Sequence, residues 1–219
     1  MKRIKQRDTV FSPENEPYLG IKSIEWFDRI IIWTLEGNEA VATWTRNHEG
    51  SLTRLQHAAC QIIPQGISIA LSIREMIRQA YLFSALILIR SLMERAAIIS
   101  YLDLNPDTLS LWEDGWRRGE RPDLAQMLSS MSDRSQQEAQ LVCSAHNHIV
   151  HGDPIGSYQN IIRLQDGSIG YSSGKMIDNH QLCDYIAMEA QCYLVVLTSR
   201  MCRIFPNVHI PEMPKNNMK

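Results

Sequence analysis

The chain has 219 residues, of which 44% are hydrophobic, so it is long enough for one domain with a substantial core. Its formal net charge of -2 excludes a general electrostatic attraction to nucleic acid, and any such contact must come from a local patch. The five cysteines form no C-x-x-C pair, which argues against a disulfide framework and a zinc ribbon. The start lacks an apolar signal segment and the longest apolar run is interrupted by Arg90, so we expect a soluble, cytoplasmic protein with no membrane contact.

The first third of the chain predicts an arm and a series of helices. Residues 1–20 combine a basic run with prolines and predict a flexible N-terminal arm. Helices are predicted over about 23–46 and 51–63, each opening on a serine that can cap it. Residues 64–66 (Pro-Gln-Gly) predict a break or a kink, and the helical pattern resumes over 67–78. No glycine or proline marks a bend between this segment and the next helix.

Residues 82–104 form the segment around which the fold is expected to be built. They are apolar on almost every side of a helix, which is typical of the centre of a bundle. The segment nevertheless carries Arg90, Glu94 and Arg95, and buried charges are costly unless they are paired or used. Arg90 and Glu94 lie four residues apart on one face, which we expect to meet the histidine-rich residues 143–154.

The rest of the chain predicts shorter helices, a hairpin and one more long helix. Pro106 ends the central helix, and short helices are predicted after Asp107, over 123–131, and from Ser132 or Asp133 to about Val150. Alternating strands around Gln165-Asp166-Gly167 predict a β-hairpin at about residues 160–172. Asp178 or Asn179 is predicted to start a helix that ends near Phe205.

These elements predict an all-α fold, a helical bundle with a long central helix and one inserted hairpin. The expected organisation is a flexible arm over residues 1–20, a single domain over 21–206 and a tail over 207–219.

Three histidines and an aspartate lie close together near the end of one predicted helix: His146, His148, His151 and Asp153. Each residue of a helix turns by about 100°, so His146 and His148 point to nearly opposite sides. A third ligand for His148 and His151 would have to come from elsewhere, and the chain offers no second pair of histidines or cysteines. We therefore predict no metal site and no cofactor.

Asn147 and His151 lie four residues apart and share a face at the end of this helix. A histidine there can act as a general acid or base, and Arg90 or Arg95 can supply the cation that holds a phosphate. Alternatively, both residues satisfy backbone groups at a helix end, where the helix dipole favours a positive histidine. Composition alone favours this structural interpretation.

The segment from His146 to His151 resembles the signature of the HEPN superfamily, an arginine followed by a polar residue, three further residues and a histidine. Asn147 and His151 match the polar residue and the histidine, and His146 stands at the arginine position. The central R-S-L-M-E of residues 90–94 also resembles an HEPN-like family, so the likeness covers about residues 68–153. The resemblance implies a homodimer in which the motif helices meet across a two-fold axis.

The resemblance implies a metal-independent endoribonuclease of a toxin–antitoxin or antiphage system, with His151, Asn147, His146, Arg90 and Glu94 as site residues. Such chemistry needs no metal, because the RNA 2′-hydroxyl is the nucleophile and a histidine moves the protons. On this basis His146→Arg is expected to restore the cation and raise activity. The alternative is a degenerate HEPN module that binds RNA or a partner protein, such as an antitoxin, without cutting.

Four arginines are candidates for RNA contact: Arg95, Arg117, Arg118 and Arg121. The last three lie in a loop beside Trp112 and Trp116, where phosphate contacts and base stacking can combine. The structural alternative is a solvated loop over packed tryptophans.

Overall fold

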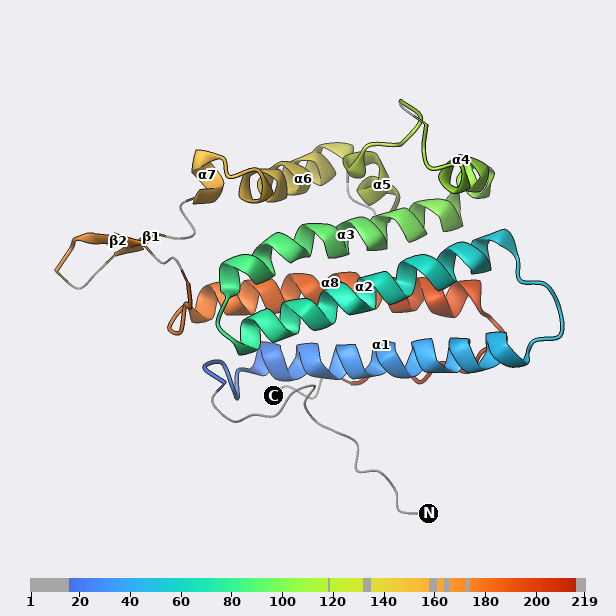
Figure 1. The fold of residues 1–219 in the computed structure, drawn as a ribbon, viewed down its shortest axis with the longest axis horizontal. Helices are drawn as coiled ribbons and strands as arrows, with labels where there is room; N and C mark the ends of the chain where they lie inside the picture. The colour runs from blue at the N-terminus through green and yellow to red at the C-terminus, as the bar shows by residue number, and fades with distance from the viewer. Residues whose placement is uncertain are drawn as a thin grey trace, which may run out of the picture.

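The computed structural model describes residues 16–117, 119–131, 135–157, 161–163, 166–171 and 174–215. The fold is predominantly helical, in agreement with the all-α prediction, and is shown in Figure 1. The long helices are α1 (Lys22–Asn47), α2 (Arg54–Arg78), α3 (Leu82–Leu104) and α8 (His180–Ile204). The short ones are a 3-10 turn (Pro106–Thr108), α4 (Leu109–Glu113), α5 (Leu124–Met131), α6 (Gln136–Val150) and α7 (Pro154–Ser157).

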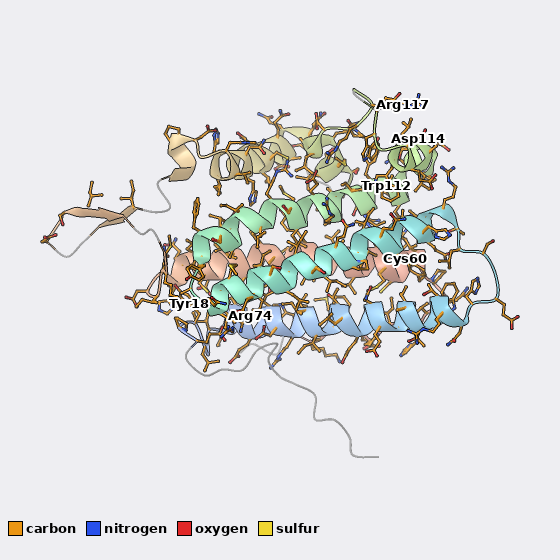
Figure 2. The ribbon with its side chains drawn as sticks, in the orientation of Figure 1. Tyr18, Cys60, Arg74, Trp112, Asp114 and Arg117 are labelled. Carbon is orange, nitrogen blue, oxygen red and sulfur yellow. The ribbon has the colours of Figure 1, made fainter. Side chains whose placement is uncertain are left out.

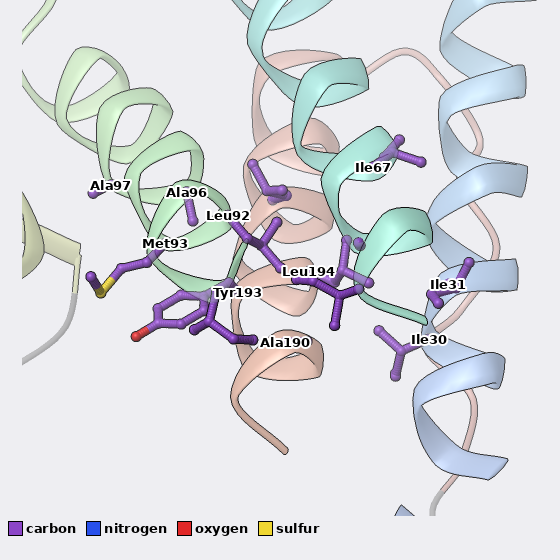
Figure 3. Close-up of a cluster of buried hydrophobic side chains, with 14 of the residues drawn as sticks. Ile30, Ile31, Ile67, Leu92, Met93, Ala96, Ala97, Ala190, Tyr193 and Leu194 are labelled. Carbon is purple, nitrogen blue, oxygen red and sulfur yellow. The ribbon is translucent and has the colours of Figure 1, made fainter. Parts of the chain in front are cut away.

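The central position of α3 agrees with its apolar sequence. It lies between α2 and α8 on one side and the layer of α4 to α7 on the other, and α1 covers the far side of α2 and α8 (Figure 1). Leu86, Ile89, Leu92 and Ile99 of α3 are almost completely shielded from solvent. Figure 3 shows how such side chains gather between the helices, with labelled residues from several of them: Ile30, Ile31, Ile67, Leu92, Met93, Ala96, Ala97, Ala190, Tyr193 and Leu194.

Helix α2 continues through the residues that predicted a break. Pro64 lies inside the helix, so a break at residues 64–66 was the wrong prediction. A Cβ atom added to Gly66 would lie 2.4 Å from Cδ1 of Leu197, so glycine here allows α2 and α8 to approach closely. The helix begins after Thr53, which forms a capping box with Gln56, and not after Ser51 as predicted.

The bend between α2 and α3, which nothing in the sequence marks, is made by Ala80. Its φ is 65°, a left-handed conformation that is unusual for an alanine. Ala80 is fully buried, its N–H donates to the carbonyl of Ile77, and its own carbonyl accepts a 2.8 Å hydrogen bond from Met176 N–H. Contact with the segment before α8 therefore stabilises this turn.

The helix caps agree with the sequence in some places and differ in others. Asn179 caps α8 by accepting a hydrogen bond from Leu182 N–H. It is one of the two residues at which this helix was predicted to start. Ser135 caps α6, whereas the predicted caps at positions 132 and 133 lie outside the described residues. The hydroxyl of Ser23 does not cap α1 and instead donates to Asp184 of α8.

Two three-residue strands, β1 (Ile161–Arg163) and β2 (Ile169–Tyr171), lie between α7 and α8 in the chain. They project away from the helical bundle (Figure 1). They pair antiparallel, with Ile162 opposite Gly170. Positions 160, 164, 165 and 172 of the predicted hairpin lie outside the described residues. In the described part of the chain, no helix combines the length and apolar character needed to cross a membrane.

The predicted boundaries of the arm and the tail require correction. Glu16 and Tyr18, which were assigned to the flexible arm, are buried, and the Tyr18 hydroxyl donates to the carbonyl of Met176. The tail also packs on the bundle, because Trp33 of α1 donates a 2.7 Å hydrogen bond to the carbonyl of Pro211. The packed domain therefore includes residues on both sides of the predicted 21–206 range.

A buried ion triad joins the N-terminal segment to α1 and α2. Arg74 forms ion pairs with Glu16 at 2.6 Å and with Asp28 at 2.6 Å. All three side chains are 1% exposed. Figure 2 shows Arg74 beside Tyr18. Charges buried this deeply are stable only while each has its partners, because water cannot replace a lost contact.

We therefore expect Arg74→Met to lower the free energy of unfolding by about 3–5 kcal/mol, because it leaves two buried carboxylates without a cation. Arg54→Met is the matched control, since the ion pair of Arg54 with Glu113 is largely exposed, and it should have a much smaller effect. Urea unfolding followed by circular dichroism measures both. Equal stability of the two variants would contradict the expectation.

Candidate functional site

Arg90 joins the central helix to the histidine-bearing helix α6. Its Nε donates a 3.3 Å hydrogen bond to Oδ1 of Asn147, so the polar face of α3 meets residues 143–154 as the sequence predicted. The Arg90 side chain is 22% exposed, and its Nη1 has no hydrogen-bond partner among the described residues. Nη1 itself is buried, so the exposed part of the side chain is elsewhere. A cation that is partly exposed therefore lies beside α6 at the boundary between two layers.

Glu94, one turn after Arg90, is occupied by two arginines. Arg121, from the loop before α5, forms an ion pair with its carboxylate, and Nη1 of Arg90 lies 3.9 Å from the other oxygen. Glu94 therefore balances the charge of Arg90 and attaches the loop to α3. Arg121, predicted as an RNA contact, is joined to the site through this carboxylate.

His151 lies at the end of α6, where its backbone N–H still bonds to the carbonyl of Asn147 at 2.9 Å. Its side chain is exposed, so it can meet a ligand from solvent. The four-residue spacing places it one turn beyond Asn147 and hence on the same side of the helix as the Arg90 contact. The role of His151 as a proton-transfer group stays a prediction.

His146 differs from its predicted role as a replacement for the motif arginine. It is only 2% exposed, and burial together with the charge of Arg90 lowers the pKa of its imidazole to about 4. His146 is therefore neutral at pH 7 and cannot supply the cation. His146→Arg would bury a second cation beside Arg90, so the structure does not support it as an activating change.

His148 has partners that sequence reasoning did not find. Its Nδ1 lies 2.8 Å from Oδ2 of Asp153, and its Nε2 lies 3.3 Å from Oγ of Ser144. From their sequence pattern, His148 and Asp153 were candidates only for metal ligands. The available signal was Gly152 just after the helix, because a glycine at that position commonly turns the chain back on the last helical turn.

Arg95 and Arg117, the remaining predicted RNA-binding arginines that the structure describes, are not gathered around His151. Arg95 faces α2, since its Cβ lies 3.7 Å from a Cβ placed on Gly66, and its Nε is buried. Arg117 is 73% exposed and pairs with Asp114. Figure 2 shows Arg117 and Asp114 near α4, at the opposite end of the layer from α7. Arg118 lies outside the described residues.

This end of α6 thus carries an amide bonded to a cation and, one turn or less further along, two histidines with exposed surface. A guanidinium can hold a phosphate oxygen through charge-assisted hydrogen bonds, and histidines can transfer protons near neutral pH. Among the described residues, no group of three or more histidines, cysteines, aspartates or glutamates is placed to hold a metal ion. The arrangement suits acid–base chemistry on a phosphate ester.

The burial of His146 generates a prediction about pH. The unfolded chain binds a proton at this residue below pH 6.5, whereas the folded chain does so only below about 4. The free energy of unfolding should therefore fall by about 3 kcal/mol through His146 as the pH decreases from 6.5 to 4. Above pH 6.5, His146 should contribute no pH dependence to stability.

We expect His146→Leu to remove this part of the pH dependence, and His209→Leu, at an exposed histidine, to leave it intact. Urea unfolding at several pH values between 4 and 8 measures the difference between each variant and the wild type. Parallel curves for the wild type and His146→Leu would show that His146 is not protonated on unfolding.

Comparison of the chain with family models, with curated proteins and with solved structures finds no match. The resemblance to the HEPN superfamily therefore stays a prediction.

Proposed function

We propose that the protein is a metal-independent endoribonuclease of a toxin–antitoxin or antiphage defence system. The observation that carries the proposal is the hydrogen bond between Arg90 Nε and Asn147 Oδ1. It holds a permanent cation beside the face of α6 that ends in the exposed His151. The HEPN resemblance assigns the cation to position 146, and Arg90 from α3 takes this role instead.

The proposed reaction is attack of an RNA 2′-hydroxyl on the adjacent phosphate. The products are a 2′,3′-cyclic phosphate and a free 5′-hydroxyl. Arg90 stabilises the negative charge that develops on the phosphate oxygens, because a planar guanidinium matches their geometry. Asn147 orients Arg90, and His151 transfers protons. RNA is required, because DNA lacks the attacking hydroxyl.

A second candidate function is a module that binds a partner protein, and a surface feature favours it. A groove of about 300 Å³ lies between α6 and α8, lined by Glu138, Val142, Ala145, His146, Tyr185 and Glu189. Leu141, Tyr185 and Met188 of these two helices are 67%, 43% and 56% exposed. Of these three, Tyr185 lines the groove. Clusters of exposed apolar side chains are typical of protein contacts. An antitoxin or another subunit of a defence complex would suit this surface.

The test of the nuclease is cleavage of single-stranded RNA in the presence of EDTA. We expect His151→Ala to reduce the rate by about 10² to 10⁴, the usual contribution of acid–base catalysis. Arg90→Gln should also reduce cleavage, because it removes the charge that stabilises the transition state. The activity should be unaffected by EDTA, since the proposed chemistry uses no metal.

His209→Ala is the matched control, since His209 is exposed and lies in the C-terminal segment that follows α8. It should cleave as the wild type does. Circular dichroism must show that each variant is folded, because His151 ends α6. A wild type that leaves RNA intact contradicts the nuclease and favours the binding module.

We also propose a homodimer, from the HEPN resemblance and the exposed apolar side chains of α6 and α8. Double substitution of Leu141 and Met188 by aspartate should give a monomer if these residues lie in the interface, since the new charges would have to be buried. Light scattering at micromolar concentration measures the mass of the wild type and the variant. A monomeric wild type contradicts the dimer.

A further inference from the structure

The end of α6 folds the chain back over its own last turn. Gly152 has a φ of 70°, and the N–H of Asp153 bonds to the carbonyl of His148 at 3.1 Å. This six-residue closure with glycine in the left-handed conformation is a Schellman motif. Gly156 of α7 packs tightly behind it, since an added Cβ would lie 2.3 Å from the His148 carbonyl oxygen. The turn places the Asp153 side chain back beside α6.

The contact of Asp153 with His148 determines which ring nitrogen carries the proton. A carboxylate only accepts hydrogen bonds, so the Nδ1 that lies 2.8 Å from Oδ2 of Asp153 must carry hydrogen. In the neutral imidazole, Nε2 is then the acceptor, and the hydroxyl of Ser144 donates to it at 3.3 Å. The His148 side chain is 34% exposed, so part of the ring is accessible from solvent.

His148 also belongs to the functional face of α6. With about 100° for each residue, Asn147, His151, Ser144 and His148 follow one another within an arc of about 100° around the helix. His146, Cys143 and Ala139 lie on the adjoining buried side. His148 and His151 are three residues apart, so their side chains are neighbours on one surface. Two histidines therefore share the face to which Asn147 brings Arg90.

We propose that His148 is the general base of this site and that Asp153 is the residue that positions it. The inference rests on the proposed ribonuclease function. The Ser144 hydroxyl holds the place that the RNA 2′-hydroxyl takes when substrate binds. The proton of the 2′-hydroxyl passes to His148 Nε2 as the O2′–P bond forms. His151, in its protonated form, gives a proton to O5′ as the P–O5′ bond breaks, and exchange with solvent then restores both rings.

A purely local role, in which Asp153 and His148 only close the helix end, makes different demands. Closure depends on the backbone hydrogen bond of Asp153 and on Gly152, and neither needs the imidazole. Catalysis needs Nε2 to be the acceptor, and it needs a base and an acid with distinguishable effects. These requirements can be measured separately.

The experiment compares two RNA substrates under single-turnover conditions. One is an ordinary labelled single strand, and in the other sulfur replaces the bridging 5′-oxygen at the cleaved position. A thiolate leaves without receiving a proton, so this substrate does not need a general acid. We expect His148→Gln and His151→Gln each to slow cleavage of ordinary RNA by about 10² to 10⁴. The sulfur substrate should restore the rate of His151→Gln and leave His148→Gln slow.

Nitrogen NMR of histidine-labelled protein examines the dyad directly. In the wild type, His148 should carry its proton on Nδ1, and Asp153→Ala should redistribute it between the two nitrogens and slow cleavage. His209→Gln is the control for both measurements and should match the wild type.

The outcomes separate the inference from the function on which it rests. A wild type that does not cleave RNA overturns both. Cleavage that is unchanged in folded His148→Gln overturns the inference alone, and so does recovery of this variant with the sulfur substrate. A proton found on Nε2 of His148 in the wild type also overturns it, because that nitrogen could not accept from the 2′-hydroxyl.

Discussion

The central helix α3 is buried on most of its surface, where a charged group is costly without a partner. Three of its charged residues, Arg90, Glu94 and Asp103, bond to side chains of other elements. Arg90 meets Asn147 of α6, and Glu94 meets Arg121 from the loop before α5. Asp103, which is 6% exposed, forms an ion pair at 2.9 Å with Arg200 of α8. These contacts connect α3 to α6 and the loop before α5 on one side and to α8 on the other.

The candidate site follows from this constraint. A cation that must be paired at the boundary of two layers remains partly exposed there, and its partner on α6 is followed by a helix end rich in histidine. The helix end supplies its own geometry, because Gly152 turns the chain and returns Asp153 to His148. The site therefore combines a long-range contact, which brings the cation, with a local motif, which orients a histidine.

Elements with strong local signals were predictable from the sequence. The bounds of α3 agree with its apolar run, and Asn179 caps α8 as expected, because capping and periodicity depend on neighbouring residues. The conformations at Pro64 and Ala80 could not be predicted from neighbouring residues. A proline within α2 and a left-handed alanine after it persist because packing compensates for their local cost.

The sequence by itself determined that the chain is helical, that α3 is central and that polar residues of α3 and α6 meet, since these depend on the pattern of apolar residues. Only the tertiary structure decided the roles of the histidines. His146 and His148 are two residues apart, yet the first is buried beside Arg90 and the second borders solvent beside Asp153. The direction in which α6 packs on α3 sets this difference. Packing direction depends on the whole surface of both helices, and not on the residues next to each histidine.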